Sequence, residues 1–287
     1  MSGRRGEGGK GGPPLRRLVL CADDYALHPL IDQAVQALAR AGRLSATSCM
    51  TTAPHWPAAA AALRELRPAL ALGLHFNLTE GHGGHHGHAQ GGALTLGQVL
   101  RRAYAGGLRV PALRAQWAVQ LDAFERALGT PPDFIDGHQH VHQLPGVRQA
   151  LLQELQARYG AHEMPWVRST WPAGSLWRSP KAAAIALLGG WTARRQLRRA
   201  GVVMNRGFGG VYAFDAPDVA AYRAHMRRWL SQLPDGGLLM CHPAAAPVPR
   251  DGLAGQRVVE WDYLRSQAFA RDLAQAGCRL HQGPMRG

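Results

Sequence analysis

Short apolar runs alternate with longer amphipathic segments along most of the chain. The runs that predict β-strands lie at residues 16–22, 46–51, 69–76, 133–136, 165–169, 202–205, 237–241 and 278–281. Between them, apolar residues recur at helical spacing near residues 30–41, 57–67, 111–128, 146–158, 180–200, 216–232 and 261–276. Alternation of this kind is typical of βα units built around a parallel sheet. No change in composition divides the pattern, so it predicts one barrel-like α/β domain.

Two segments depart from this pattern. Residues 1–14 are rich in glycine and charged residues, which predicts a disordered tail before a domain over residues 15–287. Residues 81–92 (GHGGHHGHAQGG) have neither helical nor strand periodicity. A solvated loop is a simpler interpretation of this segment than adventitious metal binding by its four histidines.

The composition favours a cytoplasmic globular protein. Hydrophobic residues make up 46% of the chain, yet no apolar run approaches the roughly 20 residues that span a membrane. The first residues carry no apolar segment of signal-peptide type. The four cysteines are too widely spaced for a CxxC pair, which argues against a disulfide framework or a cysteine zinc site. The oligomeric state stays open, with a homodimer as one hypothesis.

The formal net charge of +14 makes nucleic acid the first partner to consider. Nearly all of the basic residues are arginines, however, and pairs such as Arg101-Arg102 and Arg194-Arg195 fall in helix-like stretches, where a solvated helix face explains them. No zinc-finger, RNA-binding or helix-turn-helix signature accompanies them. We therefore expect no specific nucleic-acid binding.

Ionisable side chains follow five of the predicted strands. In a parallel α/β barrel the carboxyl ends of the strands meet on one rim, where catalytic groups collect. If the fourth strand continues through residue 142, its three histidines share one face. A carboxylate and two imidazoles that converge on this rim could surround one cation. In chain order, the side chains concerned are Asp23, Asp24, His75, Asp136, His138, His140, His142, Arg168 and His242.

Each of these residues alone also has a structural explanation. Asp23 and Asp24 could form an Asx turn or a helix N-cap, which aspartate favours. His75 could be a core histidine, and His242 before Pro243 could simply end a strand. The convergence of several strand ends on one rim favours a metal site over these separate explanations.

Four sequence blocks carry a family resemblance. ADDY, GLHFNLTEG, DGHQHVHQLP and MCHPA resemble, in order and spacing, the blocks ADDFG, GLHLNLT, DSHQHVHxxP and MCHPG of the YdjC/ChbG-like carbohydrate deacetylases, over about residues 16–243. The resemblance implies a single-domain, distorted (β/α) TIM-like barrel with one divalent metal ion. It also implies hydrolysis of an acetamide on an amino sugar, such as a chitooligosaccharide.

The resemblance further implies roles for individual residues. It assigns Asp24, His75 and His138 as the metal ligands and Asp23 as the general base. His242 is our candidate for the acid that protonates the leaving amine, because histidine changes charge near neutral pH. Two imidazoles and a carboxylate suit zinc, while a site completed by water would also take magnesium, manganese or cobalt. The supporting residues, which would pair with Asp23 or orient the ligands, are Arg168, Asp136 and His140.

The chain departs from the family pattern at two turns. Tyr25-Ala26 replaces the usual Phe-Gly after the aspartate pair, and Ala244 replaces the glycine after CHP. The glutamate that often precedes MCHPG is missing. The phrases FGGVYAF and RVVEWDYLRS resemble the branch found with hopanoid lipid biosynthesis rather than the chitobiose branch.

These residues predict a metal-dependent hydrolase that removes an acetyl group from an N-acetylated amino sugar or a sugar-bearing lipid intermediate. One alternative is another metal-dependent amidohydrolase with the His-x-His pair of DGHQHVH as ligands, although that class carries the pair after its first strand. A second alternative is a non-enzymatic protein, either an Arg-rich nucleic-acid binder or a His-rich metal buffer. Replacing Asp23 would then change no function.

If the positive charge only reflects arginine-rich surfaces, binding to DNA will be weak, insensitive to base sequence and lost steeply as salt rises. Titration of a labelled duplex and a scrambled duplex at rising salt tests this expectation. Tight binding that discriminates between the two duplexes at physiological salt would reverse our ranking of the hypotheses.

Overall fold

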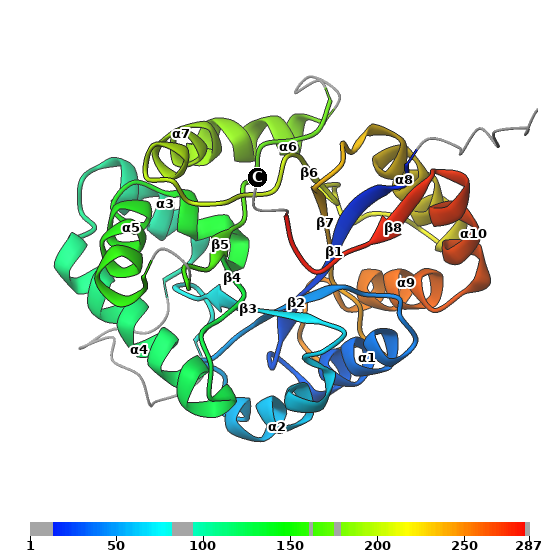
Figure 1. Ribbon diagram of the computed structural model, residues 1–287, viewed down its shortest axis with the longest axis horizontal. Helices are drawn as coiled ribbons and strands as arrows, with labels where there is room; N and C mark the ends of the chain where they lie inside the picture. Colours follow the sequence, from blue (N-terminus) through cyan, green and yellow to red (C-terminus); the bar gives the residue numbers. More distant parts are fainter. Residues whose placement is uncertain (1–13, 82–93, 161–162, 175–178, 285–287) are drawn as a thin grey trace, which may run out of the picture.

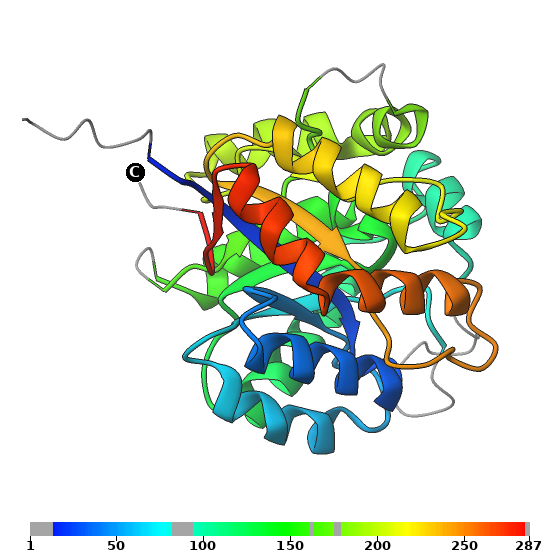
Figure 2. The ribbon, with the colours of Figure 1, turned by 90° about the vertical axis from the view of Figure 1, so that its right-hand side faces the viewer.

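A curled, all-parallel sheet forms the centre of the protein, and helices cover its outer side (Figures 1 and 2). The computed structural model describes residues 14–81, 94–160, 163–174 and 179–284. The main path of the sheet has the strand order β5-β4-β3-β2-β1-β7-β6, and β8 pairs with β1. The strands are β1 (Arg16–Tyr25), β2 (Ala46–Cys49), β3 (Ala71–Phe76), β4 (Phe134–Gly137), β5 (Trp166–Val167), β6 (Phe208–Gly209), β7 (Gly237–Cys241) and β8 (Cys278–Leu280).

Helices connect successive strands, as the alternating pattern predicts. The 3₁₀ helix η1 (His138–Gln143) follows β4 directly, and the π-helical segment η3 (Ala186–Gly190) joins α6 to α7. The α-helices are α1 (Pro29–Arg40), α2 (Trp56–Leu66), α3 (Leu96–Tyr104), α4 (Val110–Leu128), α5 (Val147–Arg158), α6 (Pro180–Ile185), α7 (Trp191–Arg199), α8 (Val219–Gln232), α9 (Ala254–Leu264) and α10 (Gln267–Gln275).

The sheet curls around β1, its longest strand. Leu18 of β1 pairs with β7 on one side and β8 on the other, while the later residue Ala22 pairs with β7 and β2. At the far edges, isolated bridges join Val167 to Met204 and Pro172 to Phe208, which brings β5 towards β6. This arrangement confirms the single-domain α/β fold of distorted-barrel type.

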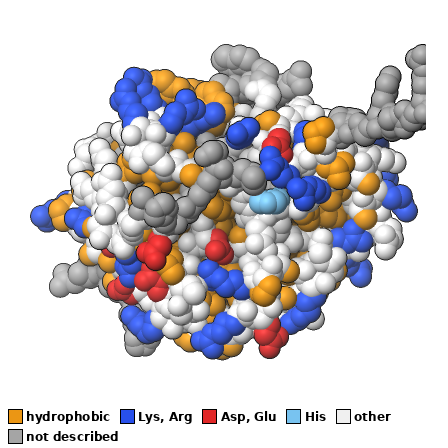
Figure 3. Space-filling view, in the orientation of Figure 1, with side chains coloured by type: hydrophobic (Ala, Val, Ile, Leu, Met, Phe, Trp, Pro, Cys, Tyr) orange, Lys and Arg blue, Asp and Glu red, His pale blue; other side chains and the backbone are white. Residues whose placement is uncertain are grey.

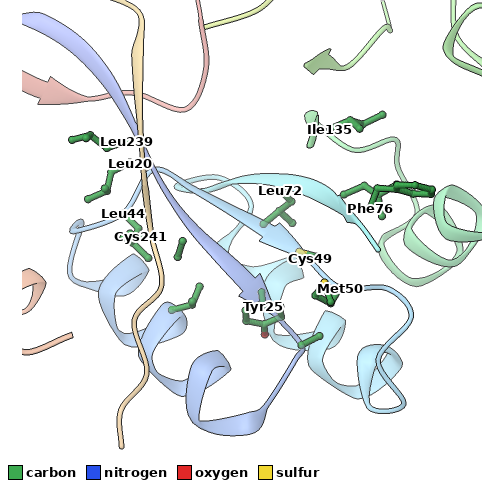
Figure 4. Packing of buried hydrophobic residues seen from close by; sticks show 14 of the residues in the cluster. Leu20, Tyr25, Leu44, Cys49, Met50, Leu72, Phe76, Ile135, Leu239 and Cys241 are labelled. Carbon is green, nitrogen blue, oxygen red and sulfur yellow. The ribbon is translucent and has the colours of Figure 1, made fainter. Parts of the chain in front are cut away.

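Buried side chains form two layers, one on each side of the sheet. Leu20 and its β7 partner Leu239 belong to the larger cluster, which fills the space between the strands and the helices (Figure 4). Val19 and Cys21 point the other way and pack with Phe134 and residues of β5, β6 and β7. The alternation along β1 therefore directs the next odd-numbered residue, Asp23, to the same inner side as Cys21.

The alternation along β1 breaks at the aspartate pair. The pairing of β1 with β2 is irregular between Ala22 and Tyr25, and Asp24 has a left-handed backbone with a φ of 68°. Ala26 is also left-handed, with a φ of 72°, at the position where the family pattern has glycine. This irregularity turns Asp24 towards the inner side, although the alternation alone would send it outwards.

Several predicted boundaries were wrong. The apolar run at 202–205 is not a strand, because the Val202 amide donates to the Leu197 carbonyl at the end of α7 and only Met204 forms a bridge. The sixth strand lies at Phe208–Gly209 instead. The helix predicted at 261–276 is two helices, of which the second begins after Ser266, whose side chain accepts from the Phe269 amide.

Two sequence-based expectations fall outside the described residues. These are the tail over 1–14, apart from Pro14, and the Gly/His-rich segment over 81–92, apart from Gly81. Among the residues that the structure does describe, no helix has the length and apolar character needed to cross a membrane.

Ala26 provides a test of this backbone geometry. It is fully buried and left-handed, a conformation that costs a non-glycine residue about 1–2 kcal/mol. Ala26→Gly removes this strain, but part of the gain in stability is lost because glycine has greater freedom in the unfolded chain. The free energy of unfolding should therefore rise by about 0.5–1 kcal/mol. The control Ala34→Gly, inside α1, should lower it by about 1 kcal/mol. Urea denaturation measures both, and equal destabilisation would contradict strain at Ala26.

Candidate active site

A pocket of about 680 Å³ opens where β1, β3 and β7 reach their carboxyl ends. Six of the eight predicted site residues line it, and Asp136 and Arg168 lie buried beside them instead. The six are Asp23, Asp24, His75, His138, His140 and His242.

Asp24, His75 and His138 converge on one point of this pocket. Asp24 Oδ1 lies 3.0 Å from His138 Nδ1 and 3.4 Å from His75 Nε2. One candidate ligand atom from each residue lies within 4.8 Å of the other two. The three side chains come from the irregular end of β1, from β3 and from the start of η1. Together they form a potential metal-binding group of one carboxylate and two imidazoles.

Asp136 orients the ring of His75. The Nδ1 atom of His75 lies 2.6 Å from Asp136 Oδ1, and the Ser48 hydroxyl donates to the same oxygen. Because Asp136 holds the proton on Nδ1, Nε2 is the ring atom that faces Asp24, and it is the atom that would bind a cation after giving up its own proton. Burial lowers the pKa of His75, but the carboxylates of Asp136 and Asp24 outweigh burial and raise the pKa to about 10.

Arg168 binds Asp23 through two parallel hydrogen bonds. Its Nη1 and Nη2 atoms donate to Oδ2 and Oδ1 of Asp23, each at 2.6 Å, and Nη2 also lies 2.5 Å from Asp136 Oδ2. Burial raises the pKa of Asp23, but the Arg168 guanidinium outweighs burial and holds this pKa below its ordinary value. The pairing keeps Asp23 ionised and fixes the plane of its carboxylate.

Arg257 and Asp251 also belong to the site, although neither was predicted as a site residue and only Arg257 lies in a quoted phrase, RVVEWDYLRS. Arg257 Nη2 donates to Asp24 Oδ2 at 2.7 Å, while its Nε donates to Asp251. Burial raises the pKa of Asp24, but Arg257 outweighs burial and, together with His138, lowers it well below the ordinary value. Because Arg257 occupies Oδ2, it leaves Oδ1 of Asp24 facing the two imidazoles.

His242 lies near the Asp23 carboxylate. Its Nε2 atom lies 4.0 Å from Asp23 Oδ2, and its ring meets Phe214 edge to face, with the centroids 5.2 Å apart. Its backbone amide donates to Glu260 Oε2 at 2.6 Å. Glu260, which lies in the same phrase as Arg257, was not predicted as a site residue either. The available signal was the spacing of Arg257 and Glu260, which places opposite charges on one face of α9.

The histidines of DGHQHVH do not share a strand face, which corrects the sequence-based expectation. The strand β4 ends at Gly137, where a Cβ atom would lie 2.9 Å from the His142 amide nitrogen. The chain then tightens into η1, and Gln139 and His140 have positive φ values of 52° and 61°. A close turn therefore replaces the extended strand that the alternating histidines suggested.

As a result, the three histidines face different surroundings. His138 contacts Asp24, whereas the ring of His140 meets Phe208 edge to face, with the centroids 5.5 Å apart. The His142 ring lies outside the pocket lining, with Nε2 3.0 Å from the Arg168 carbonyl oxygen. Of the two proposed orienting residues, Asp136 contacts a predicted ligand, whereas His140 packs against a phenylalanine ring.

Known proteins resemble this chain over nearly its whole length. A carbohydrate deacetylase of Mus musculus is 31% identical over 299 aligned positions, which cover 93% of this chain and 94% of the mouse protein. A chitooligosaccharide deacetylase of Serratia marcescens is 26% identical, with coverage of 92% and 96%. A crystal structure from Enterococcus faecalis V583, provisionally named a cellobiose-phosphate cleavage protein, shares the fold with a TM-score of 0.69 at 18% identity, covering 93% of this chain and 97% of that one.

The family model described as YdjC-like protein matches residues 17–275, a range that contains all four sequence blocks and each residue of the pocket described above. Since this match spans most of the chain, the protein belongs to the YdjC-like family.

Proposed function

We propose that this protein is a metal-dependent carbohydrate N-deacetylase, which hydrolyses the acetamide of an N-acetylated amino sugar or of a sugar-bearing lipid intermediate. The observation that carries the proposal is the convergence of Asp24, His75 and His138 beside the ion-paired Asp23. The names of the mouse and Serratia relatives support the deacetylation of a carbohydrate. These relatives support a proposal about the whole protein, because their alignments cover nearly the whole chain.

The donor set of this site fits one divalent cation. Two imidazoles and one carboxylate form an open three-ligand site of the kind that catalytic zinc occupies. Asp136 and Arg257 each contact a ligand from behind, as the outer partners of metal ligands do. Asp24, His75 and His138 would hold the ion, which when bound would polarise the acetamide carbonyl and make water more acidic.

Asp23 would act as the general base. It is ionised and rigidly held by Arg168, and its carboxylate lines the pocket beside the proposed ligands. As water adds to the acetamide carbon, a C–O bond forms and Asp23 accepts one proton from that water. Arg168 keeps this carboxylate in place throughout the reaction.

His242 would act as the general acid. Its Nε2 atom lies 4.0 Å from Asp23 Oδ2, so both groups can reach one acetamide from adjoining sides. The C–N bond then breaks as the nitrogen takes a proton from His242, which releases acetate and a free amine. The Glu260 carboxylate and the Phe214 ring hold the backbone and the ring of His242 in this orientation.

The ligand assignment predicts metal content. In protein that lacks the Gly/His-rich segment 81–92, His75→Ala and His138→Ala should each reduce bound divalent metal from about one per chain to well below half, because two remaining ligands hold the ion poorly. The control His281→Ala follows β8 and does not line the pocket, so it should bind metal normally. Elemental analysis after dialysis measures this, and unchanged stoichiometry in both pocket variants would refute the assignment.

The two adjacent aspartates should respond differently to replacement by asparagine. Asp23→Asn should keep its metal while turnover falls by roughly 10²–10⁴, the range expected for a lost general base. Asp24→Asn should bind metal weakly, and excess metal should restore part of its activity. Release of free amine from N-acetylated sugars and glycolipids, with added metals and a chelator control, measures turnover. If Asp23→Asn loses its metal while Asp24→Asn keeps it, the two roles are reversed.

A further inference from the structure

Three large apolar side chains are exposed together on the segment from α6 to α7. Leu187 is 74% exposed, Leu188 is 41% exposed and Trp191 is 53% exposed. These three residues, called the apolar face below, fall within five consecutive positions of η3 and the start of α7. Neighbouring exposed apolar residues of this size usually mark a site of interaction rather than an ordinary surface.

The backbone conformation around Gly189 accompanies the exposure of the apolar face. Gly189 has a φ of 115°, and a Cβ atom there would lie 2.6 Å from the Gln143 carbonyl oxygen. The side-chain amide of Gln143 donates to the carbonyl oxygens of Ile185 and Leu188, at 2.8 Å and 3.3 Å. The buried Gln143 thus stabilises a π-helical turn between α6 and α7, and this turn sets the direction of the leucines.

The charge around the apolar face has one sign. Residues 179–201 contain one lysine and four arginines but no aspartate or glutamate. Within the described part of the chain, none of the four arginines forms an ion pair with a carboxylate, while Arg195 stacks on the Trp191 ring at 5.6 Å. Figure 3 shows basic and hydrophobic side chains intermixed over α7. These arginines are Arg194, Arg195, Arg198 and Arg199.

We propose that the apolar face and the arginines of α7 dock on an anionic lipid surface. Leucine and tryptophan side chains insert at the boundary between headgroups and acyl chains, and arginines beside them pair with anionic headgroups. A second copy of the chain fits less well, because a two-fold interface would bring the same four arginines against one another. This proposal goes beyond the deacetylase function and does not rest on it.

Docking there would bring the pocket close to the lipid. Lys181 and Ile185, on the same short helical segment, line the pocket. Leu188 follows Ile185 by less than one helical turn, on the outer side. A sugar headgroup that projects from the lipid surface would therefore meet the wall of the pocket that α6 provides.

Sedimentation of the full chain with vesicles tests the proposal. The protein should bind phosphatidylcholine vesicles that contain phosphatidylglycerol, and bind pure phosphatidylcholine vesicles much less. A variant with Leu187→Asn, Leu188→Asn and Trp191→Asn should lower the partition coefficient at least about fivefold, because it removes the inserted side chains. A variant with Arg195→Gln, Arg198→Gln and Arg199→Gln should lower it similarly and flatten its salt dependence.

Matched controls separate docking from the attraction of any cationic protein to anionic vesicles. Val119→Asn removes an exposed apolar residue of α4, and Arg40→Gln with Arg43→Gln and Arg279→Gln removes three positive charges elsewhere. Both controls should stay within about twofold of the unmodified protein. Equal losses in test and control variants would overturn the proposal, as would a dimer in light scattering that the triple-asparagine variant dissociates. Deacetylation of a water-soluble substrate should not change in any of these variants. A failure of the lipid-docking proposal is therefore distinguishable from a failure of the proposed deacetylase function.

Discussion

The carboxylates of Asp23, Asp24 and Asp136 are all buried at one end of the barrel, with exposed fractions of 2%, 1% and 0%. A buried ion without a partner carries a desolvation cost of several kcal/mol, so this arrangement depends on the two buried guanidinium groups that contact it. Arg168 reaches both Asp23 and Asp136, and Arg257 reaches Asp24. The site therefore requires β1, β4, β5 and α9 to be in place together, and a change in any of them would leave a buried charge uncompensated.

The same ion pairs explain the irregular backbone at the aspartates. A regular strand would direct Asp23 and Asp24 to opposite sides of the sheet. The left-handed backbone conformation of Asp24 brings both carboxylates to one pocket. Each carboxylate then contacts its own arginine. Backbone strain of this kind persists where the surrounding contacts over-determine it, and such positions are concentrated at functional sites.

Much of the fold could be predicted because its apolar pattern is local. Most predicted strands and helices lie within a few residues of their observed bounds, and the four blocks pointed to residues that do line one pocket. What failed depends on contacts between distant segments. The apolar run at 202–205 has the pattern of a strand, but the Val202 amide is hydrogen-bonded to the end of α7 instead. The spacing of His138, His140 and His142 also has the pattern of a strand, but Gly137 permits a close turn there. The roles of Arg257 and Asp251 could not be predicted either, since they appear only when Arg257 contacts Asp24, 233 residues away in the chain.

The pairing of β1 with β7 and β8 has a consequence for the order in which the protein forms. The ribosome makes β1 more than 200 residues before β7 and β8, so one side of β1 stays unpaired while the residues between them are synthesised. The hydrogen bond from Arg257 to Asp24 spans 233 residues and the one from Arg168 to Asp23 spans 145. Asp23 and Asp24 are thus synthesised long before the arginines that neutralise them, and a chain that ended before α9 would leave Asp24 without its arginine.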